Sequence, residues 1–408
     1  MARIMKPAAG VHLFLLGDSG VLFDEPAQKL FHLDTYATFI WCQLESDLDE
    51  QAILLELQTV LSISPAEADA NLASCFTLFK NLGVMRGFEK TPEKSDVDSQ
   101  ENKKPLRCDD AAFISQRHYY LLSTSFRVRF STTKQLELVD PVLSHLQHAA
   151  SMSSNMSSNL SSNSHFDIIQ DENGRIHICQ NNLSVLSCAL DEQIAPLVKS
   201  LLWQTAVNEH DYFLNIHGGV VSDGNHCLLF PAGSGSGKST LVAALVCSGF
   251  DYFSDEAALL QEPEFCVESV PLAICIKSTG IDVLREYYPN LPALPEHHRS
   301  DGKKVRYLSP ISKHANYANY APTPLPVAAI ILPRYSKEQP TVLEKVSSIE
   351  ALQGLMQECL IVNKPLNKDN VARLLTWVEN TPSYRLTVGK LEVALELIKD
   401  LAKRLGSA

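Results

Sequence analysis

Residues 228–250 read LLFPAGSGSGKSTLVAALVCSGF, and this stretch carries the most specific motif of the chain. Its first three residues form an apolar run that is typical of a buried strand, and a turn rich in glycine and serine follows at 231–237. Lys238 then opens a run of helix-forming residues that ends at Gly249. Strand, glycine-rich turn and helix in this order predict a phosphate-binding loop, in which Ala232 stands where the usual pattern has its first glycine.

The glycines and the helix that follows them explain why such a loop binds phosphate. Positions without side chains let backbone N–H groups converge on phosphate oxygens, and the amino-terminal end of the helix presents its positive dipole to the same anion. The Lys238 ammonium can reach the β- and γ-phosphates, and the Ser239 hydroxyl can hold Mg²⁺. We therefore expect ATP and Mg²⁺ as cofactors, bound by Gly233, Ser234, Gly235, Ser236, Gly237, Lys238, Ser239 and Thr240.

Two adjacent carboxylates follow the loop helix. Asp255 and Glu256 come directly after residues 251–254, a short run that predicts a strand. Ligands of open α/β sheets lie at the carboxyl ends of the strands. A carboxylate there can hold Mg²⁺ or take the proton from an attacking hydroxyl. The sequence therefore predicts Ser239, Asp255 and Glu256 as metal ligands.

A histidine lies shortly before the loop. His217 falls within residues 213–221, an apolar run that predicts a strand beside the loop strand, and two glycines follow it. A neighbouring carboxylate would favour the charged form of its imidazole, which would help to carry phosphate charge. We predict His217, Lys238 and Asp255 as catalytic residues.

The segments 216–218, 233–240 and 254–256, in this order, resemble the catalytic core of the HPr serine kinase/phosphorylase family, and they are most similar to its HPr-kinase-related branch. The similarity covers residues 115–402 and includes four further segments, 271–277, 304–308, 330–335 and 381–386. The resemblance implies an α/β domain with the P-loop kinase fold of phosphoenolpyruvate carboxykinase and a β-rich amino-terminal portion.

The same resemblance implies roles for individual residues. The loop would hold the phosphates and Mg²⁺, Asp255 would be the base that activates the acceptor hydroxyl, and His217 would stabilise the transferring phosphoryl group. Glu256 stands where the family has a second aspartate, and the signature with which HPr kinases contact HPr is not recognisable after Asp255. Charge on the phosphates or on the substrate would be neutralised by the further candidates Lys277, Arg306 and Arg334.

Residues 1–88 form a separate predicted unit. Strand and helix patterns follow one another at 12–16, 21–23, 34–44, 47–61 and 64–83. Asp34 is predicted to cap the first helix, and Ser64 with Glu67 predicts a capping box at the start of the third. Segments 31–34, 39–41 and 78–85 resemble the PqqD-like peptide chaperones, also called RiPP recognition elements. That resemblance implies a small winged-helix-like α+β domain that binds a leader peptide as an added strand. A generic winged helix would instead bind DNA, which the acidic chain does not favour.

The rest of the chain divides into ordered and polar segments. Residues 89–112 are polar and charged, which predicts a disordered linker, and a serine-rich run predicts a disordered insertion at 149–165. The kinase-like domain is expected to span 113–402. Its β-rich portion includes predicted strands at 119–123, 126–131, 136–138, 166–169 and 176–179. Its carboxyl-terminal helices are predicted at 349–360, 368–378 and 391–405, and we expect them to pack over the sheet.

Composition narrows the class of protein. The formal net charge of −12 argues against nucleic-acid binding. The ten cysteines contain no C-x-x-C pair, which indicates neither a zinc site nor a disulfide framework and is compatible with the cytoplasm. No apolar run approaches the roughly 20 residues that a membrane span needs. We expect a cytoplasmic protein without a membrane span. The resemblance to the HPr kinase family, whose members form oligomers, also suggests a homo-oligomer.

These observations predict an ATP- and Mg²⁺-dependent kinase that transfers the γ-phosphoryl group to a hydroxyl. The expected acceptor is a serine of a peptide or small protein that the amino-terminal domain recruits. Two alternatives remain at this point: a small-molecule kinase that acts on a free serine-type substrate, and a non-catalytic ATP-binding regulatory module.

Overall fold

The computed structural model describes residues 5–88, 112–147, 162–310 and 323–406. The chain divides into two compact units. Unit 1 comprises Met1–Gln100, Val346–Gln353 and Lys364–Pro382, and unit 2 comprises Glu101–Lys345, Gly354–Asn363 and Ser383–Ala408. Residues 364–382 therefore belong with the amino-terminal unit, although the sequence placed them in the kinase-like domain. The predicted linker lies outside the described residues except for residue 112, as does the predicted insertion except for 162–165.

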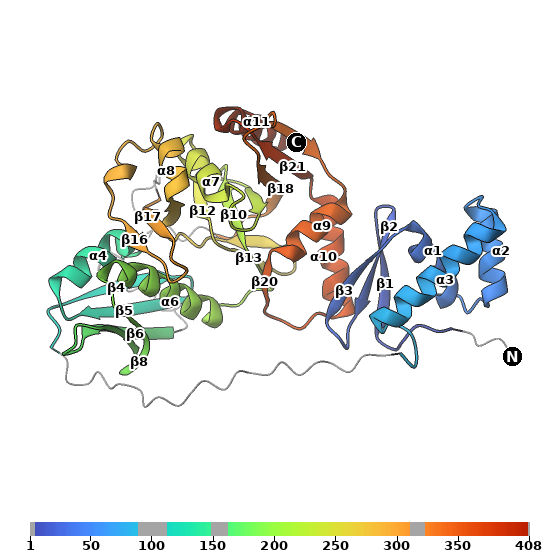
Figure 1. Ribbon diagram of the computed structural model, residues 1–408, viewed down its shortest axis with the longest axis horizontal. Helices are drawn as coiled ribbons and strands as arrows, with labels where there is room; N and C mark the ends of the chain where they lie inside the picture. Colours follow the sequence, from blue (N-terminus) through green and yellow to red (C-terminus); the bar gives the residue numbers. More distant parts are fainter. Residues whose placement is uncertain (1–4, 89–111, 148–161, 311–322, 407–408) are drawn as a thin grey trace. The chain divides into compact units, whose positions relative to one another are not determined.

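Unit 1 contains an antiparallel three-stranded sheet followed by three helices (Figure 1). The elements are β1 (Val11–Leu16), β2 (Ser19–Asp24), β3 (Lys29–Leu33), α1 (Thr35–Glu45), α2 (Glu50–Val60) and α3 (Pro65–Leu82). The sequence predicted all of these except β3. Asp34 caps α1 by accepting from the Ala37 N–H, and Ser64 and Glu67 form the predicted capping box of α3. Trp41 is fully buried, and its ring packs edge-to-face with the Phe79 ring, with 5.0 Å between the ring centroids.

A helix from far along the chain completes unit 1. Helix α10 (Lys368–Asn380) packs against β1, and the segment before it is held by the side chain of Gln28. The Gln28 amide donates to the Leu366 carbonyl at 2.9 Å and accepts from the Leu366 N–H at 2.7 Å. This reciprocal pair imitates a backbone strand pairing, so it fixes residue 366 against the turn between β2 and β3.

Unit 2 begins with a five-stranded sheet of order β4-β5-β6-β7-β8. Its strands and associated helices are β4 (Ser115–Leu121), β5 (Thr124–Phe130), α4 (Thr133–Leu143), η1 (Ser144–Leu146), β6 (Ser162–Gln170), β7 (Ile176–Gln180), β8 (Leu183–Cys188), η3 (Asp191–Gln193) and α6 (Ile194–Glu209). Two predictions were wrong here. Residues 136–138 lie in α4, because Thr132 and Gln135 form a capping box and the buried positions recur at helical spacing. Residues 162–165 are not disordered, since they pair in parallel with β5.

The central sheet of unit 2 carries the predicted phosphate-binding loop. Its order is β12-β10-β11-β18-β21-β19, formed by β10 (Gly218–Ser222), β11 (Cys227–Pro231), β12 (Asp251–Ser254), β18 (Val327–Tyr335), β19 (Val342–Lys345) and β21 (Ser383–Val388). Strand β10 is antiparallel to both β11 and β12, whereas β18 is parallel to β11 and to β21. Strands β11, β12, β18 and β21 therefore run in one direction, and their carboxyl ends share one edge of the sheet.

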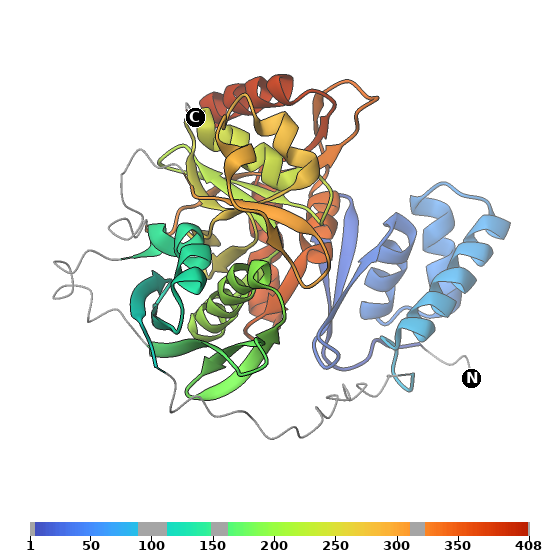
Figure 2. The same cartoon turned by 60° about the vertical axis from the view of Figure 1, so that its left-hand side comes forward.

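Two helices pack together over this sheet (Figure 2). Helices α7 (Lys238–Cys247) and α11 (Leu391–Gly406) contact each other and share one hydrophobic core with β11, β18 and β21. The core gives α7 a fixed position, so the loop before it is held against a rigid support. No helix in the described part of the chain combines the length and apolar character that a membrane crossing needs.

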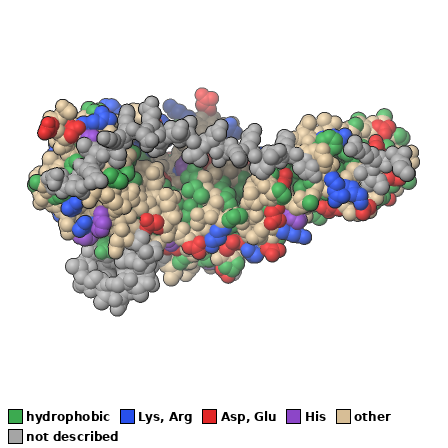
Figure 3. Space-filling model, turned by 90° about the horizontal axis from the view of Figure 1, so that it is seen from below, with side chains coloured by type: hydrophobic (Ala, Val, Ile, Leu, Met, Phe, Trp, Pro, Cys, Tyr) green, Lys and Arg blue, Asp and Glu red, His purple; other side chains and the backbone are tan. Residues whose placement is uncertain are grey.

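Two smaller sheets and several further helices make up the remaining described elements. One has the order β14-β13-β9-β20 and the other β15-β17-β16. The remaining elements are β9 (Leu214–Ile216), β13 (Ala258–Gln261), β14 (Cys266–Glu268), β15 (Ile274–Lys277), α8 (Ser278–Leu284), η4 (Leu291–Ala293), β16 (His297–His298), β17 (Lys304–Leu308), α9 (Ser348–Gln357) and β20 (Cys359–Val362). Acidic and basic side chains are interspersed on the face seen in Figure 3.

Candidate functional site

The predicted phosphate-binding loop has the expected arrangement of strand, turn and helix. Strand β11 ends at Pro231 and α7 begins at Lys238. Gly235 and Gly237 have φ angles of 97° and 85°, in the left-handed region that other residues rarely adopt. Gly237 is the N-cap of α7 and supplies no side-chain cap. The first amides of α7 are therefore left for an anion.

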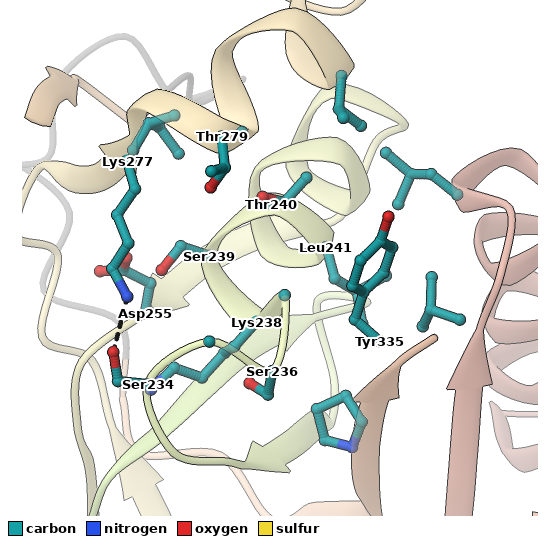
Figure 4. A pocket seen from close by; sticks show the side chains of 18 of the residues that line it. Ser234, Ser236, Lys238, Ser239, Thr240, Leu241, Asp255, Lys277, Thr279 and Tyr335 are labelled. Atoms are coloured by element: carbon teal, nitrogen blue, oxygen red, sulfur yellow. Dashed lines mark hydrogen bonds between the residues drawn. The ribbon is translucent and has the colours of Figure 1, made fainter. Parts of the chain in front are cut away.

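A cavity of about 760 Å³ opens at the loop, within the size range of small-molecule sites. Among the predicted site residues it is lined by all eight loop residues and by His217, Asp255, Glu256 and Lys277. The structure thus brings these residues together. Figure 4 shows how the side chains of Lys238, Ser239, Asp255 and Lys277 lie around the start of α7.

Two predicted substrate residues lie elsewhere and do not line the cavity. Arg306 in β17 donates to the Leu294 carbonyl at 3.0 Å, and its guanidinium lies 3.5 Å from the Glu296 carboxylate. Arg334 lies in β18 with its side chain exposed to solvent. A different arginine, Arg299, lines the cavity instead. It follows the short strand β16, a signal too weak for sequence reasoning to find.

Lys238 is the most unusual group of the site. The residue is only 6% exposed, and its Nζ has no hydrogen-bond partner among the described residues. Burial lowers the pKa of its ammonium to about 8. The Ser236 Oγ, also in the loop, is likewise buried without a partner. Buried polar groups are normally paired, so both atoms are complementary to an anion in the cavity.

Asp255 lies at the carboxyl end of β12 and is 2% exposed. Its carboxylate accepts from the Tyr252 hydroxyl at 3.2 Å and from the Cys275 N–H at 3.3 Å, and it also hydrogen-bonds to Ser239. Burial and the nearby Glu256 raise the pKa of Asp255. A carboxylate with these properties is a better proton acceptor than a solvated one.

Glu256 has a partner that the sequence did not indicate. Lys199 Nζ, on helix α6, lies 2.7 Å from Glu256 Oε1, and the Lys199 side chain is 4% exposed. Lys199 lowers the pKa of Glu256 and holds it ionised. The sequence around Lys199 does not indicate this ion pair, because only the packing of α6 brings the lysine to the loop after β12.

The residues present fit a magnesium ion. Mg²⁺ in nucleotide sites keeps several waters and takes one or two carboxylates together with substrate phosphates. Ser239 and Asp255 are hydrogen-bonded to each other and both face the cavity. Within the described ranges no group of three or more His, Cys, Asp and Glu side chains could hold a metal by itself. A cation here would therefore depend on phosphate oxygens for the rest of its ligands.

His217 lies where the chain passes from one sheet to another. The predicted strand at 213–221 is in fact two strands, β9 and β10, in different sheets. At this break the His217 N–H donates to the Glu358 carbonyl at 2.7 Å, and the His217 Nδ1 lies 3.0 Å from the Glu358 carboxylate. The predicted neighbouring carboxylate is present, but burial and Lys238 outweigh it and lower the pKa of His217. The Glu358 carboxylate thus favours the charged imidazole as expected, but it does not set the net direction of the pKa shift.

Lys277 extends across the mouth of the loop. Its Nζ donates to the Ser234 hydroxyl at 2.7 Å (Figure 4). Arg299, on the same side, lies 3.4 Å from the Asp301 carboxylate and 3.9 Å from the Cys275 sulfur. The site thus combines an unpaired ammonium, a buried carboxylate beside a hydroxyl, and two further cations. Such a set can bind a polyphosphate and accept a proton beside it.

No protein-family model and no curated protein matches the sequence. Among solved structures, the chain is similar to one described as TbiB1 in complex with the TbiA(beta) leader peptide. The two share 22% sequence identity, and the match covers 20% of this chain and 96% of that chain with a TM-score of 0.20. At this TM-score the match assigns neither a fold nor a partner.

Proposed function

We propose that the chain is an ATP- and Mg²⁺-dependent kinase that phosphorylates a hydroxyl group. The observation that carries the proposal is the unpaired, buried Lys238 ammonium at the start of α7, in one cavity with Ser239 and Asp255. In a linker or a purely structural glycine turn, a buried cation without a hydrogen-bond partner would only lower stability, because its hydrogen bonds to water are lost and not replaced. A phosphate group supplies the missing acceptors.

The proposed reaction uses these residues in distinct ways. The loop amides and Lys238 hold the β- and γ-phosphates, and Ser239 and Asp255 are the residues that would hold Mg²⁺, which neutralises phosphate charge when bound. The acceptor oxygen forms a bond to the γ-phosphorus as the bond to the β–γ bridging oxygen breaks. The electron pair leaves with ADP, and the hydroxyl proton passes to the Asp255 carboxylate.

A serine of a peptide or small protein is the proposed acceptor. In the described residues of unit 1, β3 pairs with β2 and its other edge has no strand partner. Open strand edges recruit extended peptides through main-chain hydrogen bonds. The resemblance of residues 1–88 to peptide chaperones supports the same partner. Binding there would raise the effective concentration of the acceptor.

The test incubates the full-length protein with radiolabelled ATP, Mg²⁺ and serine-containing peptides encoded beside its gene. We expect label on a peptide, and we expect Asp255→Asn to lower the rate at least a hundredfold, as loss of a general base does. Asp251→Asn, at the opposite end of β12, is the matched control and retains the wild-type rate. Transfer to free serine alone would indicate a small-molecule kinase, and ATP binding without any transfer would indicate a regulatory module.

A further inference from the structure

The cavity reaches to both sides of the phosphate-binding loop. In the order β12-β10-β11-β18-β21-β19, β12 lies on one side of the loop strand β11, whereas β18 and β21 lie on the other. The carboxyl ends of these parallel strands share one edge of the sheet. Asp255 follows β12 on the first side, and Tyr335 is the last residue of β18 on the second. Both residues line the cavity.

Tyr335 presents an open aromatic ring. The residue is 54% exposed although it lines the cavity. Its Cβ lies 3.4 Å from the position that a Cβ on Gly237 would take, so the ring stands beside the last glycine of the loop. Figure 4 shows the ring next to Leu241, on the side of α7 away from Lys277 and Asp255.

The two ends of the cavity differ in chemistry. Val388 lies beside Tyr335 in the sheet register, and the apolar residues Leu241, Pro333 and Leu391 line the cavity with them, together with Lys390 and Glu392. The other end carries charged side chains, namely Lys238, Asp255, Glu256, Lys277 and Arg299. A triphosphate is complementary to the charged end. A flat group with apolar faces is complementary to the apolar end.

We propose that the nucleobase of the bound nucleoside triphosphate stacks on the ring of Tyr335, in a subsite completed by Leu241, Val388 and Leu391. The inference rests on the proposed function and adds the direction in which the nucleotide lies. With the terminal phosphates at Lys238, the rest of the nucleotide extends over the ends of β18 and β21. These strands lie about 5 and 10 Å from β11, a span that suits a ribose and a base.

The nucleobase cannot occupy the end of the cavity near Asp255 if the proposed reaction takes place there. The side toward Asp255 must admit the acceptor hydroxyl, and its cations suit an acceptor or phosphate that carries negative charge. Lys390 and Glu392 line the Tyr335 end and supply polar groups for the ribose hydroxyls and the edge of the base. The subsite thus has the usual composition of a small-molecule site, apolar walls with a few polar groups.

The experiment compares ATP with inorganic tripolyphosphate, which carries the phosphates without a base. Binding of each ligand to the full-length protein is measured by isothermal titration calorimetry in the presence of Mg²⁺. We expect Tyr335→Ala to weaken ATP binding about tenfold, as the loss of one base–aromatic stack does, and to leave tripolyphosphate binding within about twofold of wild type. Tyr335→Trp retains ATP affinity because it keeps an aromatic face.

Tyr36→Ala truncates an exposed tyrosine on α1, so this matched control leaves both affinities unchanged. If Tyr335→Ala binds ATP as tightly as wild type, or weakens both ligands equally, the stacking subsite is overturned while the phosphate site stands. If the wild-type protein binds tripolyphosphate as tightly as ATP, the base adds no affinity, and the stacking subsite is also overturned. A wild-type protein that binds neither ligand overturns the proposed function, and the subsite with it.

Discussion

Lys199 Nζ lies 2.7 Å from Glu256 Oε1 and joins helix α6 to the loop that follows β12. The Lys199 side chain is buried at 4% exposure, and that of Glu256 is 31% exposed toward the cavity. Because Asp255 is the neighbouring residue, the ion pair also fixes the backbone that presents the proposed base. The pair therefore connects the packing of α6 to the geometry of the site.

We expect Lys199→Met to lower the free energy of unfolding by about 2 kcal/mol, because Glu256 loses the hydrogen bond to its cation while half-shielded from water. Urea denaturation measures this change. The double variant Lys199→Met/Glu256→Gln restores most of the loss, since it leaves no unpaired charge. Lys399→Met breaks an exposed pair with Glu396 and serves as the control, with a change below about 0.5 kcal/mol. A double variant no more stable than the single one would contradict this account.

Lys238→Met should separate stability from binding. In the ligand-free protein the variant removes a buried charge without a hydrogen-bond partner, so its melting temperature should equal or exceed that of wild type. Its ATP affinity should fall at least about tenfold, because a charged hydrogen bond to phosphate is lost. Calorimetric melting and ATP titration measure the two effects. A variant that melts well below wild type would mean that Lys238 has a structural partner.

His217 should depend on Glu358 for its protonation and orientation. Glu358→Gln removes the carboxylate that raises the pKa of His217, so this pKa, already lowered by burial and by Lys238, should fall further. NMR titration of the imidazole measures the shift. In the proposed kinase, kcat should fall about tenfold with little change in KM for ATP, because the imidazole is no longer held in place. An unchanged His217 pKa in the variant would refute the coupling.

Glu268 should make stability depend on pH. Its carboxylate on β14 accepts from the Gln261 amide at 2.9 Å, and burial raises its pKa to about 7. The folded protein therefore keeps this proton at pH values where the unfolded chain has lost it, so the contribution of Glu268 to stability falls as pH rises from 4.5 to about 7.

Glu268→Gln removes this dependence. The variant should melt at the wild-type temperature near pH 4.5 and a few degrees above it at pH 8. Glu264→Gln, at an exposed position nearby, is the control and leaves the melting curve unchanged at both pH values. Parallel melting curves of Glu268→Gln and wild type across this range would show that the carboxyl is not shielded from water.

Gln28 should hold the segment before α10 in place. Gln28→Ala removes both hydrogen bonds to Leu366, so the amide of Leu366 should exchange its hydrogen at least about tenfold faster. Hydrogen exchange with mass spectrometry of residues 364–367 measures the effect. Gln51→Ala, an exposed glutamine on α2, leaves the exchange unchanged. Equal exchange in Gln28→Ala would mean that the protection comes from α10 itself.

Features that depend on residues close together in the chain could be predicted from the sequence. The strand, glycine-rich turn and helix around Lys238, the strand before Asp255, the capping box at Ser64 and the cap at Asp34 were all predicted and are present. Each arises from backbone conformation and hydrogen bonds within a few residues, which local sequence controls. Short patterns gave wrong predictions where they are compatible with both a helix and a strand. At residues 136–138, three alternating residues predicted a strand, but the segment lies in helix α4.

Tertiary packing determines which groups from distant parts of the chain meet at the loop. Lys199 reaches Glu256 through the packing of α6, and Glu358 reaches His217 from 141 residues away. Tyr335 joins the cavity and Arg334 does not, although they are adjacent in β18, because successive side chains of a strand point to opposite faces. Such pairings follow from sheet order and helix packing, which no local pattern records. The loop motif predicts a phosphate site, and the fold brings charged and apolar side chains to the cavity around it.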